Sequence, residues 1–292
     1  MIARRTLLQN FAALSAVGAI QLGSGMPAFA EEREEIPLWP GQPPGKGGTT
    51  GPEKLGGAGT GFGALSNIST PRMRVYRPAK PNGAAVLVCG GGGYFRIQLW
   101  KESTPIAQWL QERGFTVFEL LYRLPNDGWE ASAPFMDAQR AMRIIRTKAT
   151  EFRLDPKQIG VMGFSAGGHL AGFTAYQPER QLYIGSDTYE KVSARPDFAA
   201  LLFPVVSLRR PYDTTRSRRE IIGDNPSTEA EIAWSLDTYA SADAPPTIIF
   251  ASADDKTAPP GHGIMLFEKL NAAGASAELH LFRDGGHGWG LG

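Results

Sequence analysis

Apolar residues recur along the chain in two kinds of stretch, which alternate from about residue 72 onward. Short runs that are apolar throughout, such as AAVLVC at residues 84–89, are typical of strands buried on both faces. Longer stretches place Phe135, Ala138 and Met142 on one side of a helix and predict an amphipathic segment. The predicted strands cover residues 72–77, 84–89, 115–121, 159–164, 198–206, 247–251 and 277–282. The predicted helices cover residues 104–113, 134–152, 166–176 and 261–273.

Strands that alternate with helices predict an α/β fold in which a mostly parallel central sheet has helices on both faces. In such sheets, ligands bind beyond the carboxyl ends of the strands. Polar residues directly after predicted strands are therefore the first candidates for chemistry.

The first 30 residues have the three parts of an export signal: a basic start with Arg4 and Arg5, an apolar middle, and an Ala-x-Ala end at Ala30. The arginine pair resembles that of a twin-arginine signal. Residues 31–63 are rich in Gly and Pro and predict an irregular arm, with a disordered linker as the alternative. Residues 64–292 form the predicted main domain. We expect a periplasmic or secreted protein that keeps no membrane anchor after signal cleavage.

Composition narrows the chemistry only slightly. A formal net charge of +1 gives no reason to expect nucleic acid as a partner. The single cysteine, Cys89, cannot form an intrachain disulfide, and four histidines are few for a metal site. We expect neither a metal nor another cofactor.

The segment GFSAGGH, which begins at Gly163, places a serine between a predicted strand and a predicted helix. In this context, the spacing Gly-x-Ser-x-Gly indicates a nucleophile held on a sharp turn, and Ser165 would be that nucleophile. A serine hydroxyl needs a base to accept its proton, and His287 follows the last predicted strand. Asp255 follows an earlier strand and would orient the imidazole, with its neighbour Asp254 as the alternative.

A second glycine run, VCGGGGYF at residues 88–95, follows the first buried strand. Its backbone amides could stabilise an oxyanion, and we expect Gly91 and Gly92 to act together with Ala166. A phosphate-binding loop is disfavoured because the run lacks the Gly-x-Gly-x-x-Gly spacing. We expect Tyr94 and Trp289 to contact substrate because each adjoins a catalytic segment.

Two further features are expected beside this site. Arg123 and Asp137 could form a buried ion pair that steadies the neighbouring loops. Residues 207–243, between two core strands, form the expected cap. Their basic stretch RRPYDTTRSRRE is expected to be a solvated face, with binding of an anionic sugar as the alternative.

Taken in order, the motifs IPLWPGQPPG, VCGGGGY, LLYRLP, IGVMGFSAGGHLA and GGHGWGL resemble one group of proteins. The chain is similar to alpha/beta-hydrolase esterases of the acetyl-xylan and feruloyl esterase type, also described as dienelactone-hydrolase-like. The resemblance implies a metal-independent serine esterase for acylated carbohydrate. It also implies Ser165, Asp255 and His287 as nucleophile, acid and base, and Gly91, Gly92 and Ala166 at the oxyanion positions.

The chain departs from this group at two places. Gly90 stands where Pro or His usually precedes the glycine triplet. The sequence also stops at Gly292, five residues after His287, where relatives continue into a final helix. We therefore expect a fold without its last C-terminal helix. The uncovered face would be exposed, covered by the 31–63 arm, or buried in a homodimer.

The sequence thus predicts an exported serine carboxylesterase that removes short acyl groups from acylated carbohydrate such as xylan. The alternatives are a general small-ester or lactone hydrolase, and an inactive carbohydrate-binding protein with the same fold. A glycosidase would need two separated carboxylates across a cleft, and nothing in the sequence pairs with the adjacent Asp254 and Asp255 at such a distance.

Overall fold

A computed structural model describes residues 33–56, 62–185 and 187–291. The described residues from Glu34 onward cluster as one compact unit. The predicted export signal, residues 1–30, lies outside the described residues and stays a prediction. No helix in the described ranges combines the length and apolar character that crossing a membrane requires.

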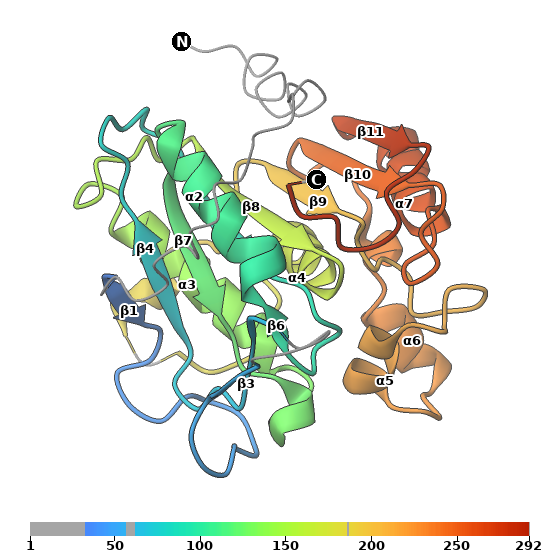
Figure 1. Cartoon of the computed structure of the whole chain (residues 1–292), viewed down its shortest axis with the longest axis horizontal. Coiled ribbons are helices and arrows are strands. Elements are labelled where there is room, and N and C mark those ends of the chain that lie inside the picture. The colour runs from blue at the N-terminus through green and yellow to red at the C-terminus, as the bar shows by residue number, and fades with distance from the viewer. Residues whose placement is uncertain (1–32, 57–61, 186, 292) are drawn as a thin grey trace. The chain divides into compact units, whose positions relative to one another are not determined.

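An eight-stranded sheet organises the unit, in the order β1-β4-β7-β5-β8-β9-β10-β11 (Figure 1). From β7 to β11 all neighbouring strands are parallel, and β4 and β1 continue the sheet as antiparallel strands. The mostly parallel sheet predicted from sequence is therefore confirmed. The strands are β1 (Glu35–Pro37), β4 (Arg72–Tyr76), β5 (Ala85–Cys89), β7 (Thr116–Leu121), β8 (Ile159–Phe164), β9 (Ala199–Leu202), β10 (Thr247–Ser252) and β11 (Ala277–Phe282).

Helices lie on both faces of this sheet (Figure 1). The helix α2 (Thr104–Glu112) packs against β4 and β7, whereas α3 (Ala133–Thr147) and α4 (Ala166–Tyr176) pack together on the opposite face. Alternate β5 residues such as Leu87 and Cys89 join α3 and α4 in one apolar core. Cys89 is fully buried, as expected for a small apolar residue.

Two predicted elements are shorter than their apolar patterns. α3 ends at Thr147 instead of residue 152, because the following residues turn. Phe152 still reaches the core, where its ring centre lies 5.0 Å from that of Phe118. β9 ends at Leu202 instead of residue 206, because Phe203 takes a φ of +37° that breaks the strand. In both cases, buried apolar residues continue beyond the end of the element into a turn. The apolar pattern in the sequence therefore predicts a longer helix or strand than the structure contains.

The arm is more ordered than predicted. Within residues 31–63, β1 pairs with β4, and β2 (Lys54–Leu55) joins β3 (Ala64–Ser66) and β6 (Ile97–Gln98) in a second, three-stranded sheet. Because β1 lies at the edge opposite β11, this part of the arm does not cover the end of the sheet at β11.

A buried ion pair anchors the arm. The guanidinium of Arg123 contacts the Asp137 carboxylate at 2.9 Å, and both side chains are fully buried, as predicted. Arg123 also donates to the Pro44 carbonyl, and Asp137 accepts from the Trp39 indole. The arm is therefore held by the two members of this ion pair. Because each member neutralises the charge of the other, their burial is tolerated.

The chain between β9 and β10 contains the predicted cap. It holds α5 (Arg216–Ile222) and α6 (Thr228–Ala233), which lie together beside the main sheet (Figure 1). The helix α7 (Gly261–Ala272) then leads into β11, the last regular element among the described residues.

Candidate active site

Ser165 lies at the sharp turn between β8 and α4. Its backbone takes φ +52° and ψ −116°, a conformation that residues other than glycine rarely adopt. Two glycines make the turn sterically feasible: a Cβ on Gly163 would lie 2.0 Å from the Gly167 carbonyl oxygen, and one on Gly167 would lie 2.1 Å from that of Cys89. The spacing Gly-x-Ser-x-Gly is therefore required by close backbone approach.

Three predicted residues meet at this turn in a chain of hydrogen bonds. His287 Nε2 lies 2.8 Å from Ser165 Oγ, and His287 Nδ1 lies 2.7 Å from Asp255 Oδ2. The other oxygen of Asp255 accepts the amides of Thr257 and Ala258. With the Asp255 carboxylate fixed by two amides, Nδ1–H of His287 can donate to it, which leaves Nε2 free to accept the serine proton.

Asp254, the alternative acid, has a different contact. Its Oδ1 accepts the Gly286 amide at 2.8 Å, and this hydrogen bond lowers the pKa of the Asp254 carboxyl. Asp254 therefore ties down the loop that carries His287, while Asp255 alone of the two contacts the imidazole.

The glycine-rich loop differs from its predicted arrangement. The Gly91 amide donates to Glu102 Oε2 at 2.7 Å, so it is not a free oxyanion donor in this structure. The amides of Gly92 and Ala166 make no hydrogen bond within the described residues. Of the three predicted donors, these two remain available beside Ser165.

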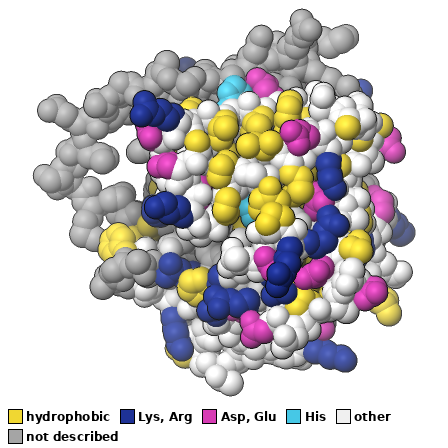
Figure 2. All heavy atoms as spheres, turned by 90° about the vertical axis from the view of Figure 1, so that its right-hand side faces the viewer, with side chains coloured by type: hydrophobic (Ala, Val, Ile, Leu, Met, Phe, Trp, Pro, Cys, Tyr) yellow, Lys and Arg dark blue, Asp and Glu magenta, His cyan; other side chains and the backbone are white. Residues whose placement is uncertain are grey.

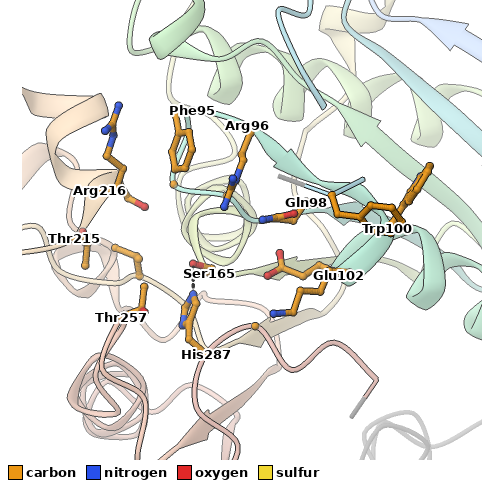
Figure 3. A pocket seen from close by; sticks show the side chains of 17 residues that line it. Phe95, Arg96, Gln98, Trp100, Glu102, Ser165, Thr215, Arg216, Thr257 and His287 are labelled. Atoms are coloured by element: carbon orange, nitrogen blue, oxygen red, sulfur yellow. Dashed lines mark hydrogen bonds between the residues drawn. The ribbon is translucent and has the colours of Figure 1, made fainter. Parts of the chain in front are cut away.

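Glu102 was not predicted from the sequence. Its side chain is only 3% exposed and comes from the short helix η3 (Leu99–Ser103). Burial raises the pKa of the Glu102 carboxyl, and the hydrogen bond from Gly91 opposes this shift. Figure 3 shows Glu102 beside Ser165 and His287. A buried carboxylate thus lies next to the place where an oxyanion would form.

A cavity of about 630 Å³ opens above Ser165 and His287 (Figure 3). Its walls come from the glycine-rich loop, β6, η3, α5 and the loop that follows β10. The side chains that the sequence analysis did not place there include Phe62, Arg96, Gln98, Thr215 and Thr257. The space is large enough for a small ester or a sugar unit.

The two predicted substrate contacts do not line this cavity. Tyr94 is fully buried, and its hydroxyl lies 2.8 Å from His169 Nδ1 in the core. Trp289 packs 5.0 Å from the Phe203 ring, and that phenylalanine in turn contacts His287. Trp289 thus packs against the phenylalanine that contacts His287, and it does not line the cavity.

Metal-ligating residues do not gather anywhere in the described ranges: no group of three or more His, Cys, Asp or Glu side chains is arranged to hold an ion. The site is built from a serine, a histidine and carboxylates.

A parallel sheet of this order, with a serine on a glycine-lined turn after β8 and a histidine after the last strand, defines an alpha/beta-hydrolase fold. The BD-FAE family model matches residues 73–270, and the chain belongs to this family.

Relatives are found among both curated proteins and solved structures. The chain is 28% identical over 232 residues to an acetylxylan esterase of Xylanibacter ruminicola, a match that covers 78% of this chain and 45% of that protein. It is 29% identical over 205 residues to endo-1,4-beta-xylanase B of Butyrivibrio fibrisolvens, covering 70% of this chain and 32% of the relative. The chain thus spans less than half the length of these two relatives.

The structural match extends further. The acetyl ester-xyloside bifunctional hydrolase from Caldicellulosiruptor lactoaceticus has a TM-score of 0.73 and 31% identity, over 90% of each chain. Esterase 2 of Thermogutta terrifontis, with propionate bound, has a TM-score of 0.62 and 27% identity, over 76% of this chain and 81% of that one.

Proposed function

We propose that this protein is a serine carboxylesterase that hydrolyses short-chain acyl esters, with acetylated carbohydrate such as xylan as its substrate class. The observation that carries the proposal is the continuous chain of hydrogen bonds from Ser165 through His287 to Asp255. The relatives named as acetylxylan esterase and acetyl ester-xyloside hydrolase support the choice of acyl group and sugar.

The proposed reaction has two steps. Ser165 Oγ attacks the ester carbonyl while His287 Nε2 takes its proton, and Asp255 stabilises the imidazolium that forms. The amides of Gly92 and Ala166 stabilise the oxyanion. His287 then protonates the leaving alcohol, and water activated by the same imidazole releases the acid from Ser165.

The decisive experiment measures acetate release from 4-nitrophenyl acetate and from acetylated xylo-oligosaccharides. Ser165→Ala should lower kcat by at least about 10³-fold on both substrates. Ser241→Ala, which alters an exposed serine outside the cavity, should leave both rates unchanged.

Each alternative function has its own outcome in this experiment. Activity on the aryl ester alone would keep the mechanism and indicate a general small-ester or lactone hydrolase. A folded wild-type protein with no activity on either ester would favour an inactive carbohydrate-binding protein.

We further propose that residues 1–30 direct export to the periplasm or medium, and that residues 64–292 are the catalytic domain. N-terminal sequencing of the protein recovered from a periplasmic fraction tests the cleavage after Ala30. We also propose a homodimer, supported by the hydrophobic side chains gathered on the side of the molecule that carries α7 and β11 (Figure 2). Met265, Phe267 and Leu279 are partly exposed there. Light scattering that finds a monomer would exclude it.

A further inference from the structure

Arg96 is an arginine in the cavity whose hydrogen-bonding capacity is unused. Its side chain lines the same cavity as Ser165 and His287 and points into it (Figure 3). The guanidinium lies 4.7 Å from the centre of the Phe95 ring. It has no ion pair or hydrogen bond to any described residue, and its Nε is buried without a partner.

The buried arginines among the described residues are paired, whereas Arg96 is only partly buried. Arg123 binds Asp137, and Arg140 binds Asp187 and Glu190. Leaving the Nε donor of Arg96 buried and unpaired is unfavourable, and partial burial lowers the pKa of the Arg96 guanidinium. An unpaired group of this kind inside a substrate cavity indicates that its partner arrives with the ligand.

The charge of the cavity agrees with an anionic partner. Arg96, Lys101 and Arg216 are cations among the described lining residues, against the single carboxylate of Glu102. Arg216 belongs to α5 in the cap and already binds Glu220, whereas Glu102 is held by the Gly91 amide. Arg96 and Lys101 are therefore the lining cations without an ion pair to a described residue, and Arg96 is the less exposed of the two.

Arg96 and Arg216 also hold Phe95 between them. The Arg216 guanidinium lies 5.0 Å from the same ring, on which Arg96 stacks at 4.7 Å. Stacking on an aromatic ring restricts the orientation of the planar Arg96 guanidinium before a ligand binds. A planar guanidinium that is already oriented binds a carboxylate through two parallel hydrogen bonds better than a flexible ammonium group does.

We propose that Arg96 binds a carboxylate of the substrate, so that the preferred esters are acyl esters of acidic molecules, such as sugars that carry a uronic acid. This inference rests on the proposed esterase function. The carboxylate can belong to the alcohol half of the ester or to its acyl half, and two pairs of substrates distinguish these sources.

The first pair is 4-acetoxybenzoate and the neutral 4-acetoxybenzamide, which differ in the charge of the leaving group. The second is 4-nitrophenyl hydrogen succinate and 4-nitrophenyl butyrate, which differ in the charge of the acyl group. The measured quantity is the ratio of kcat/KM for the charged ester to that for its neutral counterpart. Because this ratio is compared between protein variants, the intrinsic reactivities of the esters cancel.

Arg96→Gln should lower this ratio about 10- to 100-fold for one of the two pairs, with the neutral esters changed less than about threefold. Arg96→Lys keeps the positive charge but lacks the planar guanidinium, so it should lower this ratio less than Arg96→Gln does. Arg113→Gln is the matched control, because Arg113 also stacks on an aromatic ring, Trp109 at 3.8 Å, but lies outside the cavity lining.

A fall confined to the first pair assigns the carboxylate to the alcohol half, and one confined to the second assigns it to the acyl half. An unchanged ratio in both pairs, or an equal loss on charged and neutral esters, overturns the inference and leaves the esterase function intact. If the wild type cleaves no neutral ester, the proposed function fails instead.

Calorimetry on Ser165→Ala measures the same contact without turnover. In the pair of esters whose ratio responds to Arg96→Gln, the charged ester should bind more tightly than its neutral counterpart, and adding Arg96→Gln should remove the difference. Equal binding of the charged and the neutral ester in both pairs would overturn the carboxylate contact.

Discussion

The backbone amide of Gly91 donates a 2.7 Å hydrogen bond to the carboxylate of Glu102, which is buried beside Ser165. This bond ties the glycine-rich loop after β5 to the helix η3. The loop needs such an anchor because Gly92 takes a φ of +118°, so its own backbone preferences do not fix its course. The position of the Gly92 amide, a proposed oxyanion donor, therefore depends on Glu102.

Glu102→Ala should lower kcat/KM about 10- to 100-fold, because the Gly91 amide loses its partner and the neighbouring donor can move. Glu102→Gln keeps an acceptor oxygen in the same place and should retain most of the activity. The measurement is steady-state hydrolysis of 4-nitrophenyl acetate. A Glu102→Ala variant faster than Glu102→Gln would mean that Gly91 is itself an oxyanion donor, which Glu102 occupies in this structure.

The adjacent carboxylates should respond very differently to substitution. Asp255→Asn removes the charge that stabilises the His287 imidazolium and should lower kcat about 10²- to 10⁴-fold. Asp254→Asn leaves an oxygen that can still accept the Gly286 amide, so its effect should be within about threefold. Comparing kcat for the two variants on one aryl ester separates their roles. Similar losses for both would contradict the assignment of Asp255 as the acid.

The sequence predicted those parts of the site that depend on local pattern. Ser165 was found because its turn requires glycines two residues before and after it, and these leave a recognisable spacing. His287 and Asp255 were found because they follow strands of a parallel sheet, whose carboxyl ends meet at one edge.

The remaining residues are placed by tertiary contacts that leave no local pattern. Glu102 reaches Gly91 because η3 folds back over the glycine-rich loop, and a single Glu after Trp100-Lys101 gives no sign of that. Tyr94 adjoins the loop, but positive φ angles at Gly93 and Tyr94 reverse the chain and bury the ring. Adjacency in sequence was therefore a poor guide to which side chains face the cavity.

Gly167→Ala should disrupt the turn that carries Ser165. The added Cβ would lie 2.1 Å from the Cys89 carbonyl oxygen, and backbone on both sides must move to admit it. We expect a loss of at least about 2 kcal/mol in the free energy of unfolding, together with a large loss of activity. Gly41→Ala, where nothing lies within 4 Å of the new Cβ, should change the free energy of unfolding by less than about 0.5 kcal/mol. Urea unfolding monitored by fluorescence measures both, and equal stabilities would contradict the close approach.

The buried His169 should make folding sensitive to mild acid. Its Nε2 lies 2.7 Å from the Trp234 carbonyl oxygen, so this nitrogen carries the hydrogen, and Nδ1 accepts from the Tyr94 hydroxyl. Burial lowers the pKa of His169 from 6.5 to about 4. In the unfolded chain, His169 is protonated below about pH 6.5, whereas in the folded chain it is protonated only below about pH 4. The free energy of unfolding therefore falls as the pH is lowered through this interval.

For His169 the full effect is about 3 kcal/mol, since one unit of pKa corresponds to about 1.4 kcal/mol. His169→Gln can donate to the Trp234 carbonyl and accept from Tyr94 without titrating, so it should lose less stability than the wild type between pH 7.5 and pH 4. His262, whose pKa burial also lowers to about 4, is present in both proteins, so the effect of its burial enters both stability curves. The measurement is urea unfolding of both proteins at several pH values in this range. Parallel stability curves would mean that the folded protein accommodates a charged His169 without penalty.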